Sequence, residues 1–174
     1  MSTSAERVLR DGSVVRLRAL PYDDPLSQEL VEAVQEEYVV RYGGRDAAPV
    51  DPAEFLPPEG LFLVAEVDGE PAGCGAWRVH PRGVEIKRVY VAPGFRRRGL
   101  AQAVMAELET TAARAGHRTV VLNTGAKQPE AVQLYGELGY APVPGYGVYA
   151  EAPDAVFLGK DLAASTDQEE PWAS

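Results

Sequence analysis

The chain has 174 residues, 45% of them hydrophobic and 25% charged, which is enough apolar material for one globular domain and excludes disorder of the whole chain. Its formal net charge of −9 excludes a general nucleic-acid binder, because a phosphate backbone would be repelled by the average surface. The single cysteine, Cys74, excludes an intrachain disulfide and lies in an apolar run that favours a buried, inert thiol.

Both ends of the chain are polar. Residues 1–12 lack the apolar core of a secretion signal, and nowhere do 18 apolar residues run together, so we predict a cytoplasmic protein without a membrane partner. Residues 13–162 are expected to form the domain, with flexible segments over 1–12 and 163–174. His80 and His117 lie far apart without the spacing of a zinc site, so we predict no metal.

The first predicted elements are a strand and a helix. Residues 14–20 alternate in the β manner, and residues 26–42 carry apolar side chains four positions apart, as in a helix. Gly43 and Gly44 end that helix. The stretch from there to Pro58 contains four prolines and is expected to be a surface loop.

Three strands follow, over residues 61–67, 72–79 and 84–91. Asp68-Gly69 is a strong hairpin signal between the first two, and residues 81–83 form a second turn. The three strands are therefore expected to form an antiparallel meander.

The periodicity then changes to that of a helix. Apolar residues recur every fourth position from Leu100 to Ala112, and Gly116 ends the helix. A short strand over 119–122, a helix over 129–138 and closing strands over 140–143 and 155–158 complete the chain. This order predicts an α/β fold in which helices pack on a mixed sheet.

The junction between the third meander strand and the helix at Leu100 carries the sequence RRRGLA. The first amides of a helix have no internal partner, and Gly99 would let a phosphate approach them closely. Five of the 17 basic residues fall between Lys87 and Arg98, against the overall negative balance. This run predicts phosphate binding, the alternative being a solvated charge run.

The motifs of mononucleotide and dinucleotide sites are absent. The strand EIKRVYV, the segment RRRGLA and the following helix resemble the acetyl-CoA segment of the GNAT superfamily of N-acyltransferases, whose pattern is [Q/R]-x-x-G-x-[G/A]. Arg96, Gly99 and Ala101 fill the specified positions. The stretch 123–140 follows in the family's order. The resemblance implies a GNAT fold, with a mostly antiparallel central sheet flanked by helices, and an acetyl-CoA-dependent N-acetyltransferase.

The resemblance also implies how acetyl-CoA is bound. Its pantetheine arm would pair with the backbone of Val89 and Val91. Its pyrophosphate would be bound by the segment made of Arg96, Arg97, Arg98, Gly99, Leu100 and Ala101. Asn123 would reach the pantetheine from the next strand, although a turn-forming role is an equal alternative.

Two catalytic roles follow from the same resemblance. Tyr135 matches the family tyrosine that protonates the departing thiolate, whereas its helical spacing alone would make it a core aromatic. Glu85 matches a glutamate that serves as general base, and strict alternation would place it on the same face as Val89. The alternative for Glu85 is a surface carboxylate paired with a basic residue. We expect direct attack in a ternary complex, since Cys74 has no histidine partner nearby in the sequence.

The resemblance places the acceptor between the first helix and the chain after the tyrosine helix. Those segments contain Glu36, Glu37, Tyr38, Tyr42 and Asp46 on one side and residues 144–149 on the other. Acidic groups with tyrosines suit a small cationic amine, whereas Arg41 and Arg45 would suit a carboxylate, as in an amino acid. Solvated helix charges are a third interpretation of the same residues.

We expect a small-molecule primary amine as the acceptor. Acetylation of protein lysines or N-termini, and a non-catalytic acyl-CoA-binding regulatory module, are the alternatives. Dimers are common among such folds, so a homodimer is compatible with the sequence, but no segment specifies an interface.

Overall fold

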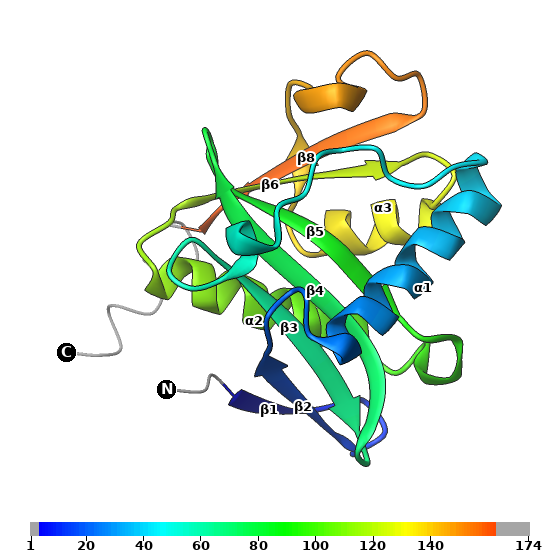
Figure 1. Cartoon of the computed structure of the whole chain (residues 1–174), viewed down its shortest axis with the longest axis vertical. Coiled ribbons are helices and arrows are strands. Elements are labelled where there is room, and N and C mark those ends of the chain that lie inside the picture. The colour runs from blue at the N-terminus through cyan, green and yellow to red at the C-terminus, as the bar shows by residue number, and fades with distance from the viewer. Residues whose placement is uncertain (1–3, 163–174) are drawn as a thin grey trace.

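The computed structural model describes residues 4–162, which form one eight-stranded sheet with helices on both faces (Figure 1). The strands lie in the order β1-β2-β3-β4-β5-β6-β8-β7. The strands are β1 (Ser4–Val8), β2 (Val14–Ala19), β3 (Gly60–Val67), β4 (Glu70–His80), β5 (Gly83–Val91), β6 (Thr119–Gly125), β7 (Ala141–Pro142) and β8 (Ala155–Asp161). The helices are α1 (Pro25–Tyr42), α2 (Leu100–Arg114) and α3 (Pro129–Glu137), with 3-10 turns η1 (Pro52–Phe55), η2 (Pro93–Phe95) and η3 (Gly147–Tyr149).

The predicted α/β class and its mixed sheet are confirmed. Strands β3, β4 and β5 form the expected antiparallel meander, and the β5–β6 pair is parallel. The predicted flexible tail over 163–174 lies outside the described residues. Within residues 4–162, none of the helices combines the length and apolar character that spanning a bilayer requires.

The N-terminal segment differs from the prediction. Residues 1–12 were expected to lie outside the domain, which is wrong from residue 4 onward: β1 pairs antiparallel with β2 at the edge of the sheet, and Leu9 is buried. An edge strand needs only every second side chain to face the protein, so a polar composition conceals it. Arg7 reaches across to the buried Glu107 of α2 at 3.0 Å, which ties the strand to the helix.

Local signals fix the ends of α1. The Asp24 side chain accepts a hydrogen bond from the Leu26 N–H at 2.9 Å, and Pro25 occupies the first helical position. Gly43 ends the helix with a φ of 79°. The last turn of the helix and the loop after it therefore lie beside the central strands of the sheet.

The helices cover opposite faces of the sheet (Figure 1). One apolar cluster packs α2 and α3 against the sheet, with Leu63, Val104 and Leu108 among its members. The other packs α1 and η1 against the opposite face, through Val34 and Phe55. We call these the α2 face and the α1 face.

A bulge in β5 reverses which side chains point to which face. Cys74 pairs with Tyr90 but Ala76 pairs with Lys87, so Arg88 and Val89 together face a single residue of β4, and Arg88 has a φ of 62°. Before the bulge Val84 and Ile86 lie on the α2 face; after it Val89 and Val91 do. The expectation that Glu85 and Val89 share a face is therefore wrong, since the extra residue shifts the alternation by one.

Strands β5 and β6 part at the centre of the sheet. Their parallel pairing runs only from Val84–Val120 to Ile86–Leu122, whereas β6 stays paired with β8 as far as Gly125–Ala155. In the described part of the chain, β5 from Lys87 onward has no strand on this side. The sheet therefore forks between the strands that lead into α2 and α3.

Candidate active site

The start of α2 presents unpaired backbone amides. The first intrahelical hydrogen bond runs from the Ala103 N–H to the Gly99 carbonyl at 3.2 Å, and in the described range no side chain caps the helix. Gly99 and Arg97 have φ values of 85° and 64°, which turn the chain sharply out of η2 into the helix. The amides of the first turn are thus free to bind an anion, as the sequence predicts.

The three arginines before Gly99 differ in their contacts. Arg96 donates to the Val91 carbonyl and pairs with Glu37, both at 3.0 Å, and Arg98 pairs with Asp11 at 2.8 Å. Arg97 is exposed, and its side chain makes no ion pair or hydrogen bond with residues 4–162. Arg97 is therefore the arginine that can meet a phosphate without giving up a contact, whereas pairing of a ligand with the Val91 carbonyl would require Arg96 to move.

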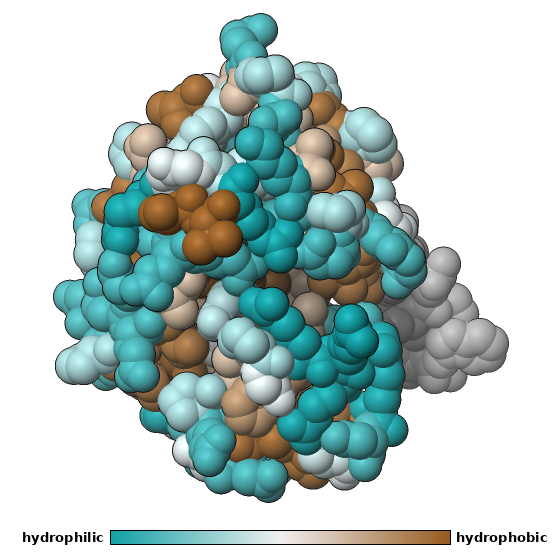
Figure 2. Space-filling view, turned by 90° about the vertical axis from the view of Figure 1, so that its right-hand side faces the viewer, coloured by the Kyte–Doolittle hydropathy of each residue, from teal (hydrophilic) through white to brown (hydrophobic). Residues whose placement is uncertain are grey.

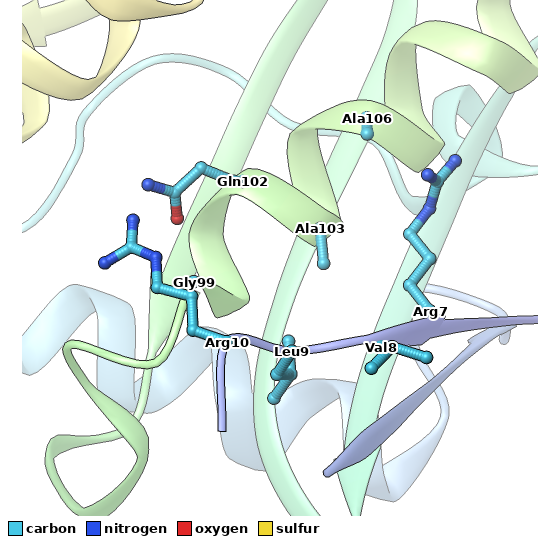
Figure 3. A pocket seen from close by; sticks show the side chains of 8 residues that line it. All are labelled: Arg7, Val8, Leu9, Arg10, Gly99, Gln102, Ala103 and Ala106. Carbon is cyan, nitrogen blue, oxygen red and sulfur yellow. The ribbon is translucent and has the colours of Figure 1, made fainter. Parts of the chain in front are cut away.

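A shallow groove of about 530 Å³ lies beside this helix start (Figure 3). It is bounded by the end of β1 with the residues after it and by the first turns of α2. The Arg10 and Gln102 side chains extend toward one another beside Gly99 (Figure 3). The Arg10 N–H also donates to the Arg98 carbonyl at 3.3 Å, so the N-terminal segment borders the anion-binding turn.

A larger cavity of about 560 Å³ occupies the fork between β5 and β6. Its lining comes from both faces of the sheet, since it includes Ile86 and Tyr135 from the α2 face and Glu85 and Lys87 from the α1 face. The cavity therefore passes through the sheet where the two strands have parted. Figure 2 shows the side of the molecule toward which β6 points, where hydrophilic and hydrophobic residues together border a hollow near the centre.

Four of the predicted site residues meet in this cavity. Its walls contain Glu85, Val89, Asn123 and Tyr135. Val91 and the segment from Arg96 to Ala101 do not line it; they lie at the far end of β5 and beyond. The predicted site is thus divided into an enclosed cavity and an anion-binding turn, joined by the open edge of β5.

Glu85 is held in a fixed position. Its side chain is 8% exposed, and its Oε1 accepts from Arg78 Nε at 3.0 Å. The Tyr146 hydroxyl is buried beside it, where burial and then the Glu85 carboxylate raise the pKa of that phenol. Arg78 also pairs with Glu54 at 3.0 Å, so one arginine serves two carboxylates.

Tyr135 is both a packed aromatic ring and a cavity residue. Its ring meets Tyr140 edge-on at 5.9 Å, and burial raises the pKa of its phenol to about 12. The phenol therefore keeps its proton at neutral pH and is available as a donor. Asn123 lies opposite Phe157 in the β6–β8 pairing and lines the same cavity.

Asp46, which the sequence placed among the acceptor residues, is the centre of a cluster on the α1 face whose basic partners were not predicted. Asp46 Oδ2 accepts from Arg88 Nη1 at 2.6 Å and from Lys87 Nζ at 3.1 Å. Its Oδ1 accepts from the Ala48 N–H at 2.9 Å and from the Tyr149 hydroxyl at 3.0 Å. Burial alone would raise the pKa of Asp46, but Lys87, the Ala48 N–H and Arg88 together hold it well below its usual range.

Lys87 and Arg88 are therefore not part of the phosphate-binding run to which the sequence assigned them. Both side chains face Asp46, away from the helix start. The sequence did contain a signal for Lys87: residues two apart in a strand share a face, so Lys87 lies on the same face as Glu85. The orientation of Arg88 depends on the bulge, for which the sequence carries no clear signal.

The predicted acceptor residues are only partly brought together. Tyr38, Tyr42 and Asp46 line the cavity, as do the residues of η3, but Glu36 and Glu37 do not. Arg41 pairs with Glu37 and Glu130, and Arg45 pairs with Glu32 through two nitrogens. Arg41 does not line the cavity, and Arg45 lines it but forms an exposed pair with Glu32, so the predicted arginine clamp is not assembled among these residues.

Cys74 is a buried thiol. Burial raises its pKa to about 12, and its Sγ donates to the Arg88 carbonyl at 3.1 Å. A thiolate nucleophile is therefore not available at neutral pH.

Known proteins share this architecture. The profile of the Acetyltransferase (GNAT) family matches residues 27–140. The chain is similar to the IAA acetyltransferase of Azospirillum brasilense, at 30% identity over 148 residues that cover 80% of this chain and 95% of that one. The crystal structure of an acyl-CoA N-acyltransferase from Klebsiella pneumoniae is similar at a TM-score of 0.70 and 28% identity, covering 84% of this chain and 96% of that one.

A GNAT family acetyltransferase from Elizabethkingia anophelis with acetyl-CoA bound shares the fold at a TM-score of 0.62 and 15% identity, over 84% of this chain and 97% of that one. The family profile thus spans the chain from the first turn of α1 to the third residue after α3, and the relative from Azospirillum matches over nearly its whole length. The chain therefore belongs to the GNAT family of acetyltransferases and is an acyl-CoA-dependent N-acyltransferase.

Proposed function

We propose that the protein transfers the acetyl group of acetyl-CoA to the primary amine of a small molecule, by direct attack in a ternary complex. The observation that carries this proposal is the cavity through the sheet. A carboxylate, Glu85, and a protonated phenol, Tyr135, reach it from opposite faces, and Val89 at the β5 bulge lies in its wall. An acceptor and an acyl donor could thus meet at the fork from different sides.

The residues at the fork fit acetyl-CoA. The free amides at the start of α2 and the exposed Arg97 suit a pyrophosphate. The open edge of β5 offers backbone groups to the amide-containing pantetheine arm, in the way that a peptide adds to a sheet edge. When bound, acetyl-CoA supplies an acetyl group activated as a thioester.

The protein's own residues have complementary roles in this proposal. Glu85 accepts the proton that an alkylammonium must lose before its nitrogen can attack. A backbone N–H at Val89 donates to the acetyl carbonyl oxygen as negative charge develops on it. Tyr135 gives its proton to the CoA sulfur as the C–S bond breaks. The nitrogen, now bonded to the acetyl carbon, loses its remaining extra proton, which restores the phenol and leaves the amide and the CoA thiol.

The covering of the cavity supports a small acceptor rather than a peptide. The loop after α1 and the η3 segment are joined above it, since the Tyr149 hydroxyl accepts from the Ala47 N–H at 2.7 Å and donates to Asp46 at 3.0 Å. A peptide would need a long open groove, and these contacts bridge one side of the cavity mouth, which favours a small acceptor.

Release of CoA thiol with a panel of small amines and lysine-containing peptides tests the proposal. We expect thiol release with small amines and none above hydrolysis with peptides. Release with peptides alone would favour protein acetylation. Calorimetric binding of acetyl-CoA without release by any acceptor would identify a non-catalytic acyl-CoA-binding module, and absence of binding would overturn the cofactor assignment as well.

A further inference from the structure

We call the cavity in the fork between β5 and β6 the acceptor cavity. Its wall on the α1 face carries opposite charges at its two ends. At one end the Lys87 ammonium and the Arg88 guanidinium share the single carboxylate of Asp46, which leaves one positive charge uncompensated. At the other end Glu85 shares Arg78 with Glu54, which leaves one negative charge. Lys87 and Arg88 are 10% and 3% exposed, so solvent does little to screen the positive end.

Asp46 cannot serve as the receptor of the substrate amine. Its two oxygens already accept four hydrogen bonds, two on each oxygen, which is the capacity of a carboxylate. Its role is to hold the two cations in place. Glu85, in contrast, accepts from Arg78 and has the Tyr146 hydroxyl beside it, so two of the four acceptor positions of its carboxylate remain for an amine.

The cations, in contrast, have donors to spare. Lys87 uses one of its three N–H groups, on Asp46. Arg88 uses Nε on the Tyr22 hydroxyl at 3.4 Å and Nη1 on Asp46, and its Nη2 donates to no group in the described range. Both residues line the cavity, so these donors can make charge-assisted hydrogen bonds to an anionic group bound there.

The spacing of the two ends suits a short zwitterion. Glu85 and Lys87 are two residues apart on one face of β5, which corresponds to about 6.6 Å along a strand. An ammonium hydrogen-bonded to the first and a carboxylate hydrogen-bonded to the second span that distance within a single small molecule.

We propose that the acceptor is an amino carboxylate, with its amine at Glu85 and its carboxylate bound by Lys87 and Arg88. This inference rests on the proposed N-acetyltransferase function and specifies its substrate class. Lys87 and Arg88 take the part that the sequence assigned to Arg41 and Arg45, both of which are engaged by glutamates.

The first test compares matched acceptors with the wild-type protein. Each amino acid of a panel that includes β-alanine is assayed for CoA-thiol release beside its primary carboxamide and the amine that lacks the carboxyl group. We expect kcat/KM to be at least about tenfold higher for the free acid, in line with a charge-assisted hydrogen bond. Amidation lowers the pKa of the amine, so a larger fraction of the carboxamide is in the neutral, nucleophilic form. Amine basicity would therefore favour the carboxamide, and a preference for the free acid over its carboxamide must have another cause.

The second test uses Lys87→Met, which removes the charge and keeps the length of the side chain. We expect KM for the free acid to rise at least about tenfold, KM for the carboxamide to stay unchanged, and Lys87→Arg to restore the preference. Lys160→Met is the matched control, because Lys160 also pairs with one carboxylate, Glu109 at 2.8 Å, but is absent from the cavity lining.

Three outcomes would overturn the inference. Equal or better turnover of carboxamides and simple amines would do so while leaving the proposed acetyl transfer intact, as would an equal effect of Lys87→Met on acid and carboxamide. If no amine releases thiol, calorimetry with N-acetyl amino acids and their carboxamides on the CoA-loaded protein decides. A preference for the acids that Lys87→Met abolishes would support the inference, and equal binding would overturn it.

Discussion

Arg88 Nη1 and Asp46 Oδ2 lie 2.6 Å apart, and this ion pair joins the bulge of β5 to the loop that follows α1. Both side chains are less than 10% exposed. The loop that covers the cavity is thus attached to β5, which lines it. The same Asp46 oxygen also holds Lys87, at 3.1 Å, so one carboxylate positions both cations.

Asp46→Asn should destabilise the fold strongly, because it leaves Lys87 and Arg88 buried without their anion. The expected loss in the free energy of unfolding is about 3 kcal/mol, measured by urea denaturation. Glu32→Gln is the control, since it removes an exposed ion pair with Arg45 and should cost less than about 1 kcal/mol. Equal losses in the two variants would contradict the assignment of Asp46 as a buried anchor.

The same carboxylate makes a prediction about acid stability. The pKa of Asp46 is lower in the folded protein than the value of about 3.9 for an unfolded aspartate, so its contribution is complete above that value. The contribution should be lost as the pH falls below about 4 toward the folded-state pKa. The stability difference between wild type and Asp46→Asn should therefore shrink over this acid range, and a constant difference would contradict the low pKa.

Tyr135→Phe should lower kcat by about 10²-fold or more while leaving acetyl-CoA affinity nearly unchanged, because it removes the proton donor and keeps the packed ring. Stopped assays of thiol release and calorimetry measure the two effects. Since burial raises the pKa of this phenol to about 12, ionisation of Tyr135 should not limit kcat of the wild type below about pH 11. Loss of affinity with unchanged kcat would instead indicate a binding role.

Glu85→Gln should lower kcat/KM by about 10²-fold or more, since glutamine retains an acceptor for Arg78 but cannot take a proton. Glu66→Gln is the matched control. Glu66 is also a strand glutamate paired with an arginine, Arg18 at 2.7 Å, and it is absent from the cavity lining. Similar activity of Glu85→Gln and wild type would remove Glu85 from the chemistry.

Gly99→Ala should weaken acetyl-CoA binding by about tenfold or more. A side chain is strained at the φ of 85°, and its methyl group would stand 3.4 Å from the Arg10 Nε, so the turn that presents the amides to a phosphate should shift. Gly116→Ala provides a control on the backbone effect. Gly116 follows the other end of α2 with a φ of 94°, close to the 85° of Gly99, and nothing lies within 4 Å of its added Cβ. Both variants should lose about 1 kcal/mol of stability, but only Gly99→Ala should lose affinity.

Much of the fold could be predicted because its elements carry strong local signals. The α1 helix was expected from residue 26 and begins at Pro25, and α2 begins at Leu100 as expected. The β1 strand could not be predicted, because an edge strand with alternate exposed residues resembles a polar terminus.

The parts of the candidate site that belong to a sequence motif could be predicted. The parts that depend on tertiary packing could not. Glu85, Val89, Asn123 and Tyr135 were identified through the family resemblance, and they meet in one cavity. The contacts of Lys87 and Arg88 were missed, since they depend on an extra residue in β5 and on a loop distant in sequence. Such long-range contacts follow from tertiary packing rather than from local periodicity.

The bulge in β5 also divides the strand into a part that faces the acceptor cavity on the α1 face and a part whose valines face α2. In the proposed site Glu85 and Lys87, before the bulge, bind the acceptor, whereas Val89 and Val91 lie on the α2 face. Under the proposed substrate class, a substitution at Lys87 can change the amine that is bound while the part of the strand after the bulge keeps its place, so one nine-residue strand separates the two binding functions.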